Sequence, residues 1–194
     1  MGRKITIYSK NCNFGAFKFP PMLHKAYLLL GSNRGNRPEM LKQAAGLIEK
    51  QVGKRTASSS VYETAPWGFF DKTFFLNQVL CVETLLSPYD LLDALLRIET
   101  VIGRIRHGKN YISRIIDIDI LFFGNHIINQ EHLTIPHPRL HERKFTLLPL
   151  AEIAAGFIHP VFRLTVGDLV LRCTDSSEVN LFFSEPVPQK EKTE

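Results

Sequence analysis

The chain has 194 residues, of which 44% are hydrophobic and 22% charged, as expected for one globular domain with a real core. No apolar run is long enough to cross a bilayer, and three scattered cysteines favour a reducing, cytoplasmic setting over a disulfide framework. A net charge of +5 does not require nucleic acid and suits a smaller anionic partner.

The two ends of the chain are expected to lie outside the folded domain. Residues 1–21 contain no acidic residue, show no helical or strand periodicity and lack the apolar segment of a secretory signal. We interpret them as a disordered arm or as an extension upstream of a natural start at Met22. The domain is expected over residues 22–173, and residues 174–194 are expected to form a C-terminal tail.

The sequence of the first half of the domain predicts three strands, with a helix between the first two and a loop between the last two. KAYLLLGSN, residues 25–33, is typical of a short buried strand that ends in turn residues. A helix follows over 37–51, with Pro38 at its start and apolar residues on one stripe. Three further segments are predicted, a strand, an aromatic loop and another strand, at 54–64, 65–72 and 73–84.

The second half repeats the alternation of helix and strand. A helix is predicted from Pro88, with Ser87 as its N-cap and Gly103 at its end. A basic segment leads to the apolar strand IIDIDILFFGN, residues 115–125, then to a turn, a short strand and a third short helix. This order is that of the ferredoxin-like, split βαβ plan. We therefore expect an α+β fold: an antiparallel sheet with helices on one face, plus an extra C-terminal helix and loops.

Two acids occur in the most apolar strand. Asp117 and Asp119 are two residues apart, so in a strand they face the same way. A half-exposed polar face would explain a lone pair of this kind, since such alternation is ordinary in antiparallel sheets. However, the same face continues as Leu121 and Phe123, so both faces look buried. Two like charges beside a core need a counter-charge, and Mg²⁺, held by one or two carboxylates plus substrate phosphates, is the natural one.

Basic residues flank this strand on both sides. Singly, each would be interpreted as a solvated surface charge. Jointly they suggest cations for phosphate oxygens beside carboxylates for Mg²⁺, which is a phosphoryl-transfer site. The basic residues are Arg104, Arg106, His107, Lys109 and Arg114 before the strand, and His137, Arg139, His141 and Arg143 after it.

The histidines at 137 and 141 also raise the possibility of zinc. Their spacing would suit a helix, but Pro136 and Pro138 argue against one, and no matching cysteine or acid is near in sequence. A phosphate or ribose contact is the preferred interpretation of His137.

Six segments occur in a distinctive order and spacing: AYLLLGSN, VYETAPWG, FFLNQVLCVET, LLRIETVIGRIR, RIIDIDILFFGN and LTIPHPRLHERKFTLLPLAEIA. Together, from about Ala26 to Gly156, they closely resemble the 6-hydroxymethyl-7,8-dihydropterin pyrophosphokinase family of folate synthesis. The resemblance implies a ferredoxin-like fold and transfer of the β,γ-diphosphate of ATP to the hydroxymethyl group of the pterin, with release of AMP.

The resemblance also assigns roles to individual residues. Asp117 and Asp119 would hold two Mg²⁺ ions, and Arg104 and Arg114 would be catalytic arginines of a mobile loop. The ATP contacts it implies are Glu99, Arg104, Arg114, Ile120, Thr134, His137 and Arg143. The pterin contacts it implies are Thr64, Phe75, Asn77 and Phe145. Aromatic rings suit a flat heterocycle and an amide can both donate and accept, although either phenylalanine alone would be interpreted as core.

The sequence departs from the family at four positions that bear on nucleotide geometry: Tyr111, Ser113, Leu96 and His132. Two other classes of protein agree less well with the sequence. A nucleotidyltransferase would hold its Gly-Ser and its paired acids close together in sequence, whereas Gly31 and Asp117 are far apart. A ferredoxin-like RNA-binding module would show a basic-glycine strand signature, which 73–82 lacks. We expect a monomer whose partners are the two small-molecule substrates, with no nucleic acid and no membrane.

Overall fold

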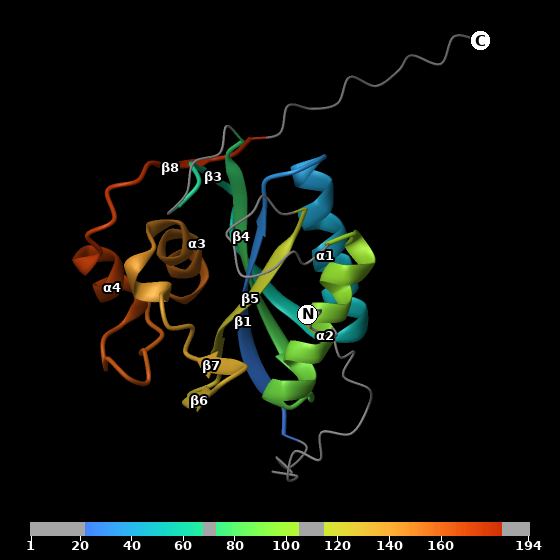
Figure 1. Ribbon diagram of the computed structural model, residues 1–194. Coiled ribbons are helices and arrows are strands. Elements are labelled where there is room, and N and C mark those ends of the chain that lie inside the picture. The colour runs from blue at the N-terminus through green and yellow to red at the C-terminus, as the bar shows by residue number, and fades with distance from the viewer. Residues whose placement is uncertain (1–21, 68–72, 105–114, 184–194) are drawn as a thin grey trace, which may run out of the picture.

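The computed structural model describes residues 22–67, 73–104 and 115–183 (Figure 1). The expected N-terminal extension at 1–21 and the end of the chain from residue 184 lie outside these ranges, as does Arg114. The strands are β1 (His24–Ser32), β2 (Lys54–Ser58), β3 (Tyr62–Thr64), β4 (Phe75–Thr84), β5 (Asp117–Phe123), β6 (Ile128–Gln130), β7 (Leu133–Ile135) and β8 (Val179–Leu181). The helices are α1 (Arg37–Gln51), α2 (Pro88–Ile102), α3 (Lys144–Ala154), α4 (Val166–Arg172) and the short 3₁₀ helix η1 (Leu140–Glu142).

The main sheet has the strand order β5-β1-β4-β3-β8, and β2 also pairs with β4. Every pairing is antiparallel. Strands β1 and β4 lie in the middle, and each is followed by a helical connection that returns to an outer position. This is the split βαβ arrangement, so the predicted ferredoxin-like α+β fold is confirmed.

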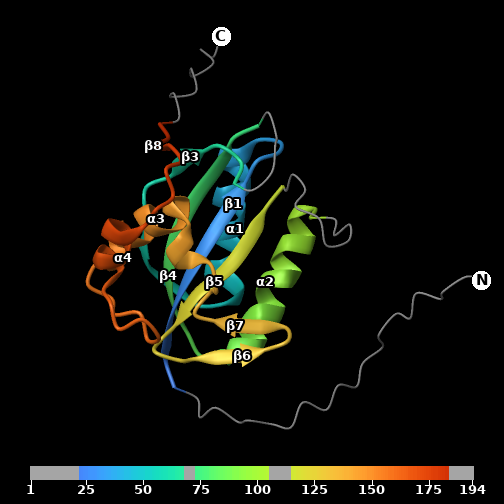
Figure 2. The same ribbon diagram turned by 60° about the vertical axis from the view of Figure 1, so that its left-hand side comes forward.

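Helices cover both faces of the sheet (Figures 1 and 2). Helices α1 and α2 pack on one face over a core that includes Leu28, Leu30 and Leu80. Helices α3 and α4 pack on the other face over a second core that includes Leu29 and Val79. The predicted helices of the split βαβ plan therefore share one face, and the extra C-terminal helix lies on the opposite one. The central strands β1 and β4 bury both of their faces, which explains why they are apolar over most of their length.

The ends of α2 follow the local signals of the sequence. The Ser87 hydroxyl accepts a hydrogen bond from the Asp90 amide (3.2 Å) and donates one to the Asp90 carboxylate (2.6 Å). Pro88 occupies the first turn, where a missing N–H costs nothing. Gly103 ends the helix with φ +106°, a left-handed conformation that favours glycine. The predicted boundaries of this helix are confirmed.

The single strand predicted over 54–64 is wrong, because two strands separated by Ser59 replace it. The Ser59 hydroxyl accepts from the Val79 amide (2.9 Å), and the carbonyl of Ser59 accepts from the Gln78 side chain (2.9 Å). Side-chain hydrogen bonds thus replace part of the ladder, as serine favours. The register also shifts between Arg55 and Ala57.

Four elements were not predicted: β7, the 3₁₀ helix η1, α4 and β8. Helix α4 begins at a capping box in which Thr165 and Asp168 bond to each other's backbone amides (3.0 and 3.1 Å). Strand β8 pairs with β3. The sheet therefore continues past the domain boundary expected at residue 173, and part of the expected tail belongs to it.

Two glycines provide a test of this packing. A Cβ at Gly53 would lie 2.1 Å from the Glu83 carbonyl oxygen. By contrast, Gly46 is an exposed residue of α1, and nothing lies within 4 Å of a Cβ there. We expect Gly53→Ala to lower the free energy of unfolding by roughly 1–3 kcal/mol, and Gly46→Ala to raise it by about 0.5–1 kcal/mol. Urea titration measures both. Equal effects of the two substitutions would contradict the close approach at Gly53.

Candidate active site

A row of three residues crosses strands β5, β1 and β4 near one end of the sheet. Gly31 on β1 pairs with Asp117 on β5 and with Asn77 on β4. Because paired residues share a face, the carboxylate and the amide flank the glycine on the same side. A Cβ at Gly31 would approach the Asn77 side-chain oxygen to 3.4 Å. The surface between the acid and the amide is therefore backbone.

The acid pair lies on the face that α3 and α4 cover. Leu121, two residues beyond Asp119, belongs to the core on that side, while Ile118 and Ile120 belong to the core under α1 and α2. Both aspartates are half-buried. The predicted common orientation of Asp117 and Asp119 is confirmed. The side chain of Ile120, one of the predicted ATP contacts, lies on the opposite face and is 6% exposed.

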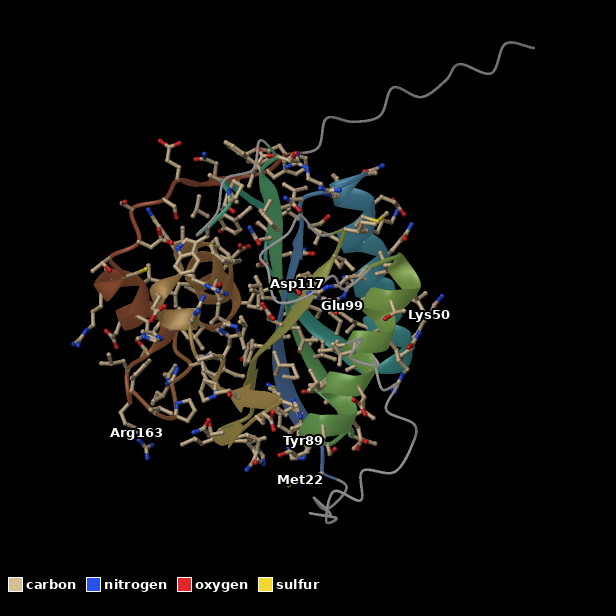
Figure 3. The ribbon with its side chains drawn as sticks, viewed as in Figure 1. Met22, Lys50, Tyr89, Glu99, Asp117 and Arg163 are labelled. Atoms are coloured by element: carbon tan, nitrogen blue, oxygen red, sulfur yellow. The ribbon has the colours of Figure 1, made fainter. Side chains whose placement is uncertain are left out.

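A buried carboxylate organises the charges next to Asp117. Glu99, near the end of α2, is 2% exposed and accepts a hydrogen bond from the Ile118 amide (2.8 Å). Arg104 forms ion pairs with both Glu99 and Asp117. Figure 3 shows Glu99 and Asp117 side by side, at the other end of the sheet from Met22. Arg104 thus provides a counter-charge to Asp117, which it shares with Glu99.

His137 follows β7 and is tied to the outer edge of β5. Its amide donates to the Leu121 carbonyl (3.0 Å), and its Nδ1 accepts from the Arg139 amide (3.2 Å). Burial, assisted by the positive charges of Arg143 and Arg139 and opposed by Asp117, lowers the pKa of His137 to about 4. The ring is therefore neutral at physiological pH, and with Nδ1 accepting, Nε2 carries the proton.

Arg143 is held between two aromatic rings. Its guanidinium carbon lies 4.8 Å from the centre of the Trp67 ring and 5.6 Å from that of Phe145. The arginine is 9% exposed. Cation–π contacts of this kind hold a guanidinium plane in place. Trp67 precedes residues 68–72, so the connection between β3 and β4 contacts a residue predicted to bind ATP.

Three of the predicted pterin residues, Thr64, Phe75 and Asn77, lie at the far end of the same row, and the fourth, Phe145, lies in α3 against Arg143. The Asn77 side-chain nitrogen donates to the Thr64 hydroxyl (2.9 Å), and both residues are 3% exposed. Phe75 pairs with Thr64 across β3 and β4 and is half-buried, as is Phe145. The site therefore has a buried amide and hydroxyl beside two partly accessible rings.

Helix α3 fixes the strand next to this amide. The Glu152 carboxylate accepts hydrogen bonds from the Ser60 amide (3.0 Å), the Ser60 hydroxyl (2.9 Å) and the Tyr62 hydroxyl (3.1 Å). Tyr62 pairs with Asn77 across the sheet. Burial and the bond to Glu152 raise the pKa of Tyr62.

The remaining predicted residues lie farther from the row. Thr134 belongs to β7, which pairs with β6 in the small second sheet. Strand β7 contacts β5, so Thr134 lies near the strand of the acid pair but in a different sheet. Arg114 lies outside the described residues, as do Arg106, His107 and Lys109. His141 packs its ring against Phe162, with centroids 4.6 Å apart.

The carboxylates fit Mg²⁺ better than zinc. Within the described ranges, no group of three or more histidine, cysteine, aspartate or glutamate side chains is placed to hold a metal alone. Zinc sites need such a set, whereas Mg²⁺ is held by one or two carboxylates and completed by water and phosphate oxygens. Asp117 and Asp119 provide that partial set.

Sequence reasoning missed several residues that build the site. The Ser32 hydroxyl donates to the Ile115 carbonyl (2.6 Å) and so fixes the approach to β5. Ser32 lies in the Gly-Ser-Asn end of β1, which predicts a turn after the strand but does not indicate a contact with Ile115. No local pattern indicated the contacts of Glu152 or the position of Trp67 over Arg143, since both join segments distant in sequence.

The known proteins that this chain resembles include two pyrophosphokinases of the same name. The 2-amino-4-hydroxy-6-hydroxymethyldihydropteridine pyrophosphokinase of Bacillus subtilis is 43% identical over 129 residues, which cover 66% of this chain and 77% of that protein. The protein of the same name from Haemophilus influenzae is 39% identical over 157 residues, 80% of this chain and 97% of the relative.

Solved structures show the same fold. The HPPK-DHPS protein of Plasmodium falciparum superposes with a TM-score of 0.64 at 20% identity, over 78% of this chain and 43% of the longer one. The chain thus spans less than half of that protein. In the described ranges, no helix has the length and apolar character needed to cross a membrane.

The fold, the acid pair and these relatives together define a kinase-class enzyme. A model of the 7,8-dihydro-6-hydroxymethylpterin-pyrophosphokinase family matches residues 27–155. The chain belongs to this family, whose members use ATP, and its activity is that of a pyrophosphokinase in folate biosynthesis.

The lowered pKa of His137 predicts a pH dependence of stability. The folded-state pKa of about 4 lies below the ordinary value of 6.5, so the unfolded chain binds the proton more readily. The contribution of neutral His137 to the free energy of unfolding is fully present above pH 6.5 and is lost as the pH falls from 6.5 to 4. His137→Asn should reduce the slope of unfolding free energy against pH in this window by at most about 1.4 kcal/mol per pH unit.

Urea titrations between pH 4 and pH 7 measure this slope. His159 provides a second test, because burial lowers its pKa to about 4 as well. His159→Asn should remove a separate part of the slope of unfolding free energy against pH. An unchanged slope in His137→Asn would show that the ring is protonated in the folded protein.

Proposed function

We propose that the row Asp117–Gly31–Asn77 is the axis of the reaction, with the pterin at the Asn77 end and the triphosphate of ATP at the Asp117 end. The pterin hydroxymethyl oxygen attacks the β-phosphorus, the bond from that phosphorus to the bridging oxygen of the α-phosphate breaks, and AMP leaves. The observation that carries the proposal is this register, because it aligns a buried amide and a metal-binding acid across a side-chain-free strand position.

The pterin is held by shape and by hydrogen bonds. Phe75 and Phe145 offer ring faces to the flat heterocycle, which gains from offset stacking. Asn77 and Thr64 are buried and already bonded to each other, so their remaining donor and acceptor positions are fixed in direction. A site of this kind rejects rings that leave the amide unpaired.

The phosphates are held at the other end of the row. Asp117 and Asp119 are the proposed ligands of two Mg²⁺ ions, which would stabilise charge on the attacking and leaving oxygens. Their half-buried carboxylates share one face of β5, as two ions that bridge one triphosphate require. Neutral His137 can donate from Nε2 to a phosphate oxygen, and the planar guanidinium of Arg143 is fixed between Trp67 and Phe145.

Arg104 and Arg114 remain the proposed catalytic arginines. Arg104 contacts Asp117 directly, so it stands at the proposed metal end of the row. Glu99 is a proposed ATP-site residue whose carboxylate contacts Arg104 and the Ile118 amide, and it would act on ATP through Arg104. Ile120 and Thr134 are proposed ATP contacts on the strength of the family resemblance, Ile120 through its main chain.

The setting of the enzyme is also proposed. We infer a cytoplasmic monomer, because its co-substrate ATP is a cytoplasmic metabolite and two cysteines, Cys81 and Cys173, are free thiols. Residues 22–173 would contain the catalytic machinery, with β8 completing the sheet.

Removing either acid should stop the chemistry. We expect Asp117→Asn and Asp119→Asn each to lower kcat roughly a hundredfold or more, because charge on the transferred phosphates is no longer neutralised. AMP release is measured across a Mg²⁺ titration, with pterin affinity expected to survive. Asp93→Asn, an exposed carboxylate on α2, is the matched control. Normal turnover in both mutants at ordinary Mg²⁺ would show that the acids are not metal ligands.

Removing the amide or one ring should act chiefly on the pterin. We expect Asn77→Ala and Phe145→Ala to weaken pterin binding by about tenfold, since the loss of one stacking face is worth on the order of 1 kcal/mol. Calorimetry with a non-hydrolysable ATP analogue should give nearly unchanged nucleotide affinity in Asn77→Ala, and in Phe145→Ala a loss smaller than that for the pterin, because Phe145 also contacts Arg143. Asn180→Ala, an exposed amide on β8, is the control. Loss of nucleotide binding with intact pterin binding would reverse the two ends of the site.

A further inference from the structure

Arg37, the first residue of α1, joins three segments next to the proposed pterin end. Its Nη1 donates to the Glu63 carboxylate on β3 (2.7 Å) and to the carbonyl oxygen of Phe74 (2.8 Å). The guanidinium carbon lies 5.9 Å from the centre of the Phe182 ring, just after β8. One side chain therefore contacts β3, the start of β4 and the end of β8.

These contacts fall where the ladder between β3 and β4 ends. Thr64 pairs with Phe75 and Glu63 pairs with Leu76. Arg37 thus binds the side chain just before Thr64 and the carbonyl just before Phe75. Beyond this pair the strands separate, so a bond across both of them fixes the spacing at the last step of the ladder.

Arg37 acts from the face opposite the site. Neighbouring residues of a strand face opposite ways, so Glu63 turns toward α1 while Thr64 turns toward Asn77. The Thr64 hydroxyl is bonded to the Asn77 amide (2.9 Å) on the site face. The arginine binds Glu63, the Phe74 carbonyl and the Phe182 ring, so we expect its effect on the pterin residues to pass through the backbone of β3 and β4.

The ion pair alone contributes little to folding. The side chains of Arg37 and Glu63 are 22% and 32% exposed, and pairs this exposed are screened by water. The hydrogen bond to the Phe74 carbonyl and the contact with the Phe182 ring fix the orientation of the Arg37 side chain, because the guanidinium is planar and forked. The expected consequence of losing Arg37 is a change of local geometry with the fold retained.

We propose that Arg37 is a positioning residue for pterin recognition: it clamps the ends of β3 and β4 and thereby fixes Thr64, Phe75 and Asn77 in their binding geometry. This rests on the proposed pterin site. Small displacements of such groups have large effects on binding and rate, which is why supporting contacts matter.

Trp67 gives an independent readout of the same region. It is the single tryptophan of the chain and lies three residues after Thr64, with its ring over Arg143 at 4.8 Å. If the clamp sets the direction in which the chain leaves β3, loss of Arg37 changes the surroundings of this ring. A purely structural role distant from the site would leave the emission of Trp67 unchanged.

The test compares Arg37→Gln and Arg37→Lys with Arg55→Gln in the full chain. Arg55 also joins α1 to the sheet, through Glu49 at 3.4 Å, but it lies away from the site and is the matched control. Calorimetry measures the affinity for 6-hydroxymethyl-7,8-dihydropterin and for a non-hydrolysable ATP analogue. Tryptophan emission and the melting temperature are recorded for each variant.

We expect Arg37→Gln to weaken pterin binding roughly tenfold and to shift the Trp67 emission, with nucleotide affinity unchanged and the melting temperature within about 3 °C of the parent. Arg37→Lys keeps the charge opposite Glu63 and should restore part of the affinity. Glu63→Gln keeps a hydrogen-bond acceptor for Arg37 but removes the negative charge, so it should weaken pterin binding less than Arg37→Gln does. The control should match the parent in every measurement.

Two results would overturn the proposal. One is pterin affinity in Arg37→Gln within twofold of the parent. The other is equal weakening of both ligands together with a large fall in melting temperature, which would make Arg37 a general stabiliser. Failure of the pterin site itself is separate: it would appear as unchanged pterin affinity in Asn77→Ala, whatever the Arg37 variants do.

Discussion

The antiparallel register on either side of β1 is the constraint on which the site depends. Because Gly31 pairs with Asp117 on one side and Asn77 on the other, residues from the second and third quarters of the chain become neighbours on one face. A shift of one residue in either pairing would turn the acid or the amide to the opposite core. The apolar faces of β4 and β5 hold this register, since a shift would also expose Leu76 or bury Asp119 among aliphatic side chains. The strand register that packs the sheet is therefore the same register that brings the site residues together.

Charge balance is the second requirement of this arrangement. A carboxylate as buried as Glu99 is stable only if its charge is compensated, and here the Ile118 amide and Arg104 provide the compensation. The same arginine contacts Asp117, so α2, the start of the basic segment and β5 share one network. His137 avoids adding positive charge because burial and its arginine neighbours favour the neutral ring. The Ile118 amide and Arg104 thus compensate Glu99 and part of the charge of Asp117 before any substrate arrives.

Those parts of the fold that depend on local signals were predictable from the sequence. Ser87, Pro88 and Gly103 mark the ends of α2 through caps that involve only neighbouring residues, and the alternation around Asp117 and Asp119 gives their common face directly. Local reasoning failed where distant contacts decide. Ser59 interrupts a strand because its hydrogen bonds go to Val79 and Gln78, and β8 forms only because β3 offers an edge. The roles of Arg37, Glu152 and Trp67 belong to this second group, since each side chain binds a segment that no sequence pattern connects to it.

The pairing of β8 with β3 has a consequence for the behaviour of the molecule in concentrated solution. An unpaired strand edge is a template on which another chain can add a strand, and proteins limit this hazard with short or polar edges. Here β3 is covered on that side by a strand of three residues, with exposed Asn180 at its centre. The outermost edge on this side is therefore only three residues long, which limits the ladder that a second chain could form on it. Residues 179–181 contribute no group to the proposed chemistry, yet they cover the edge of β3 that would otherwise be unpaired.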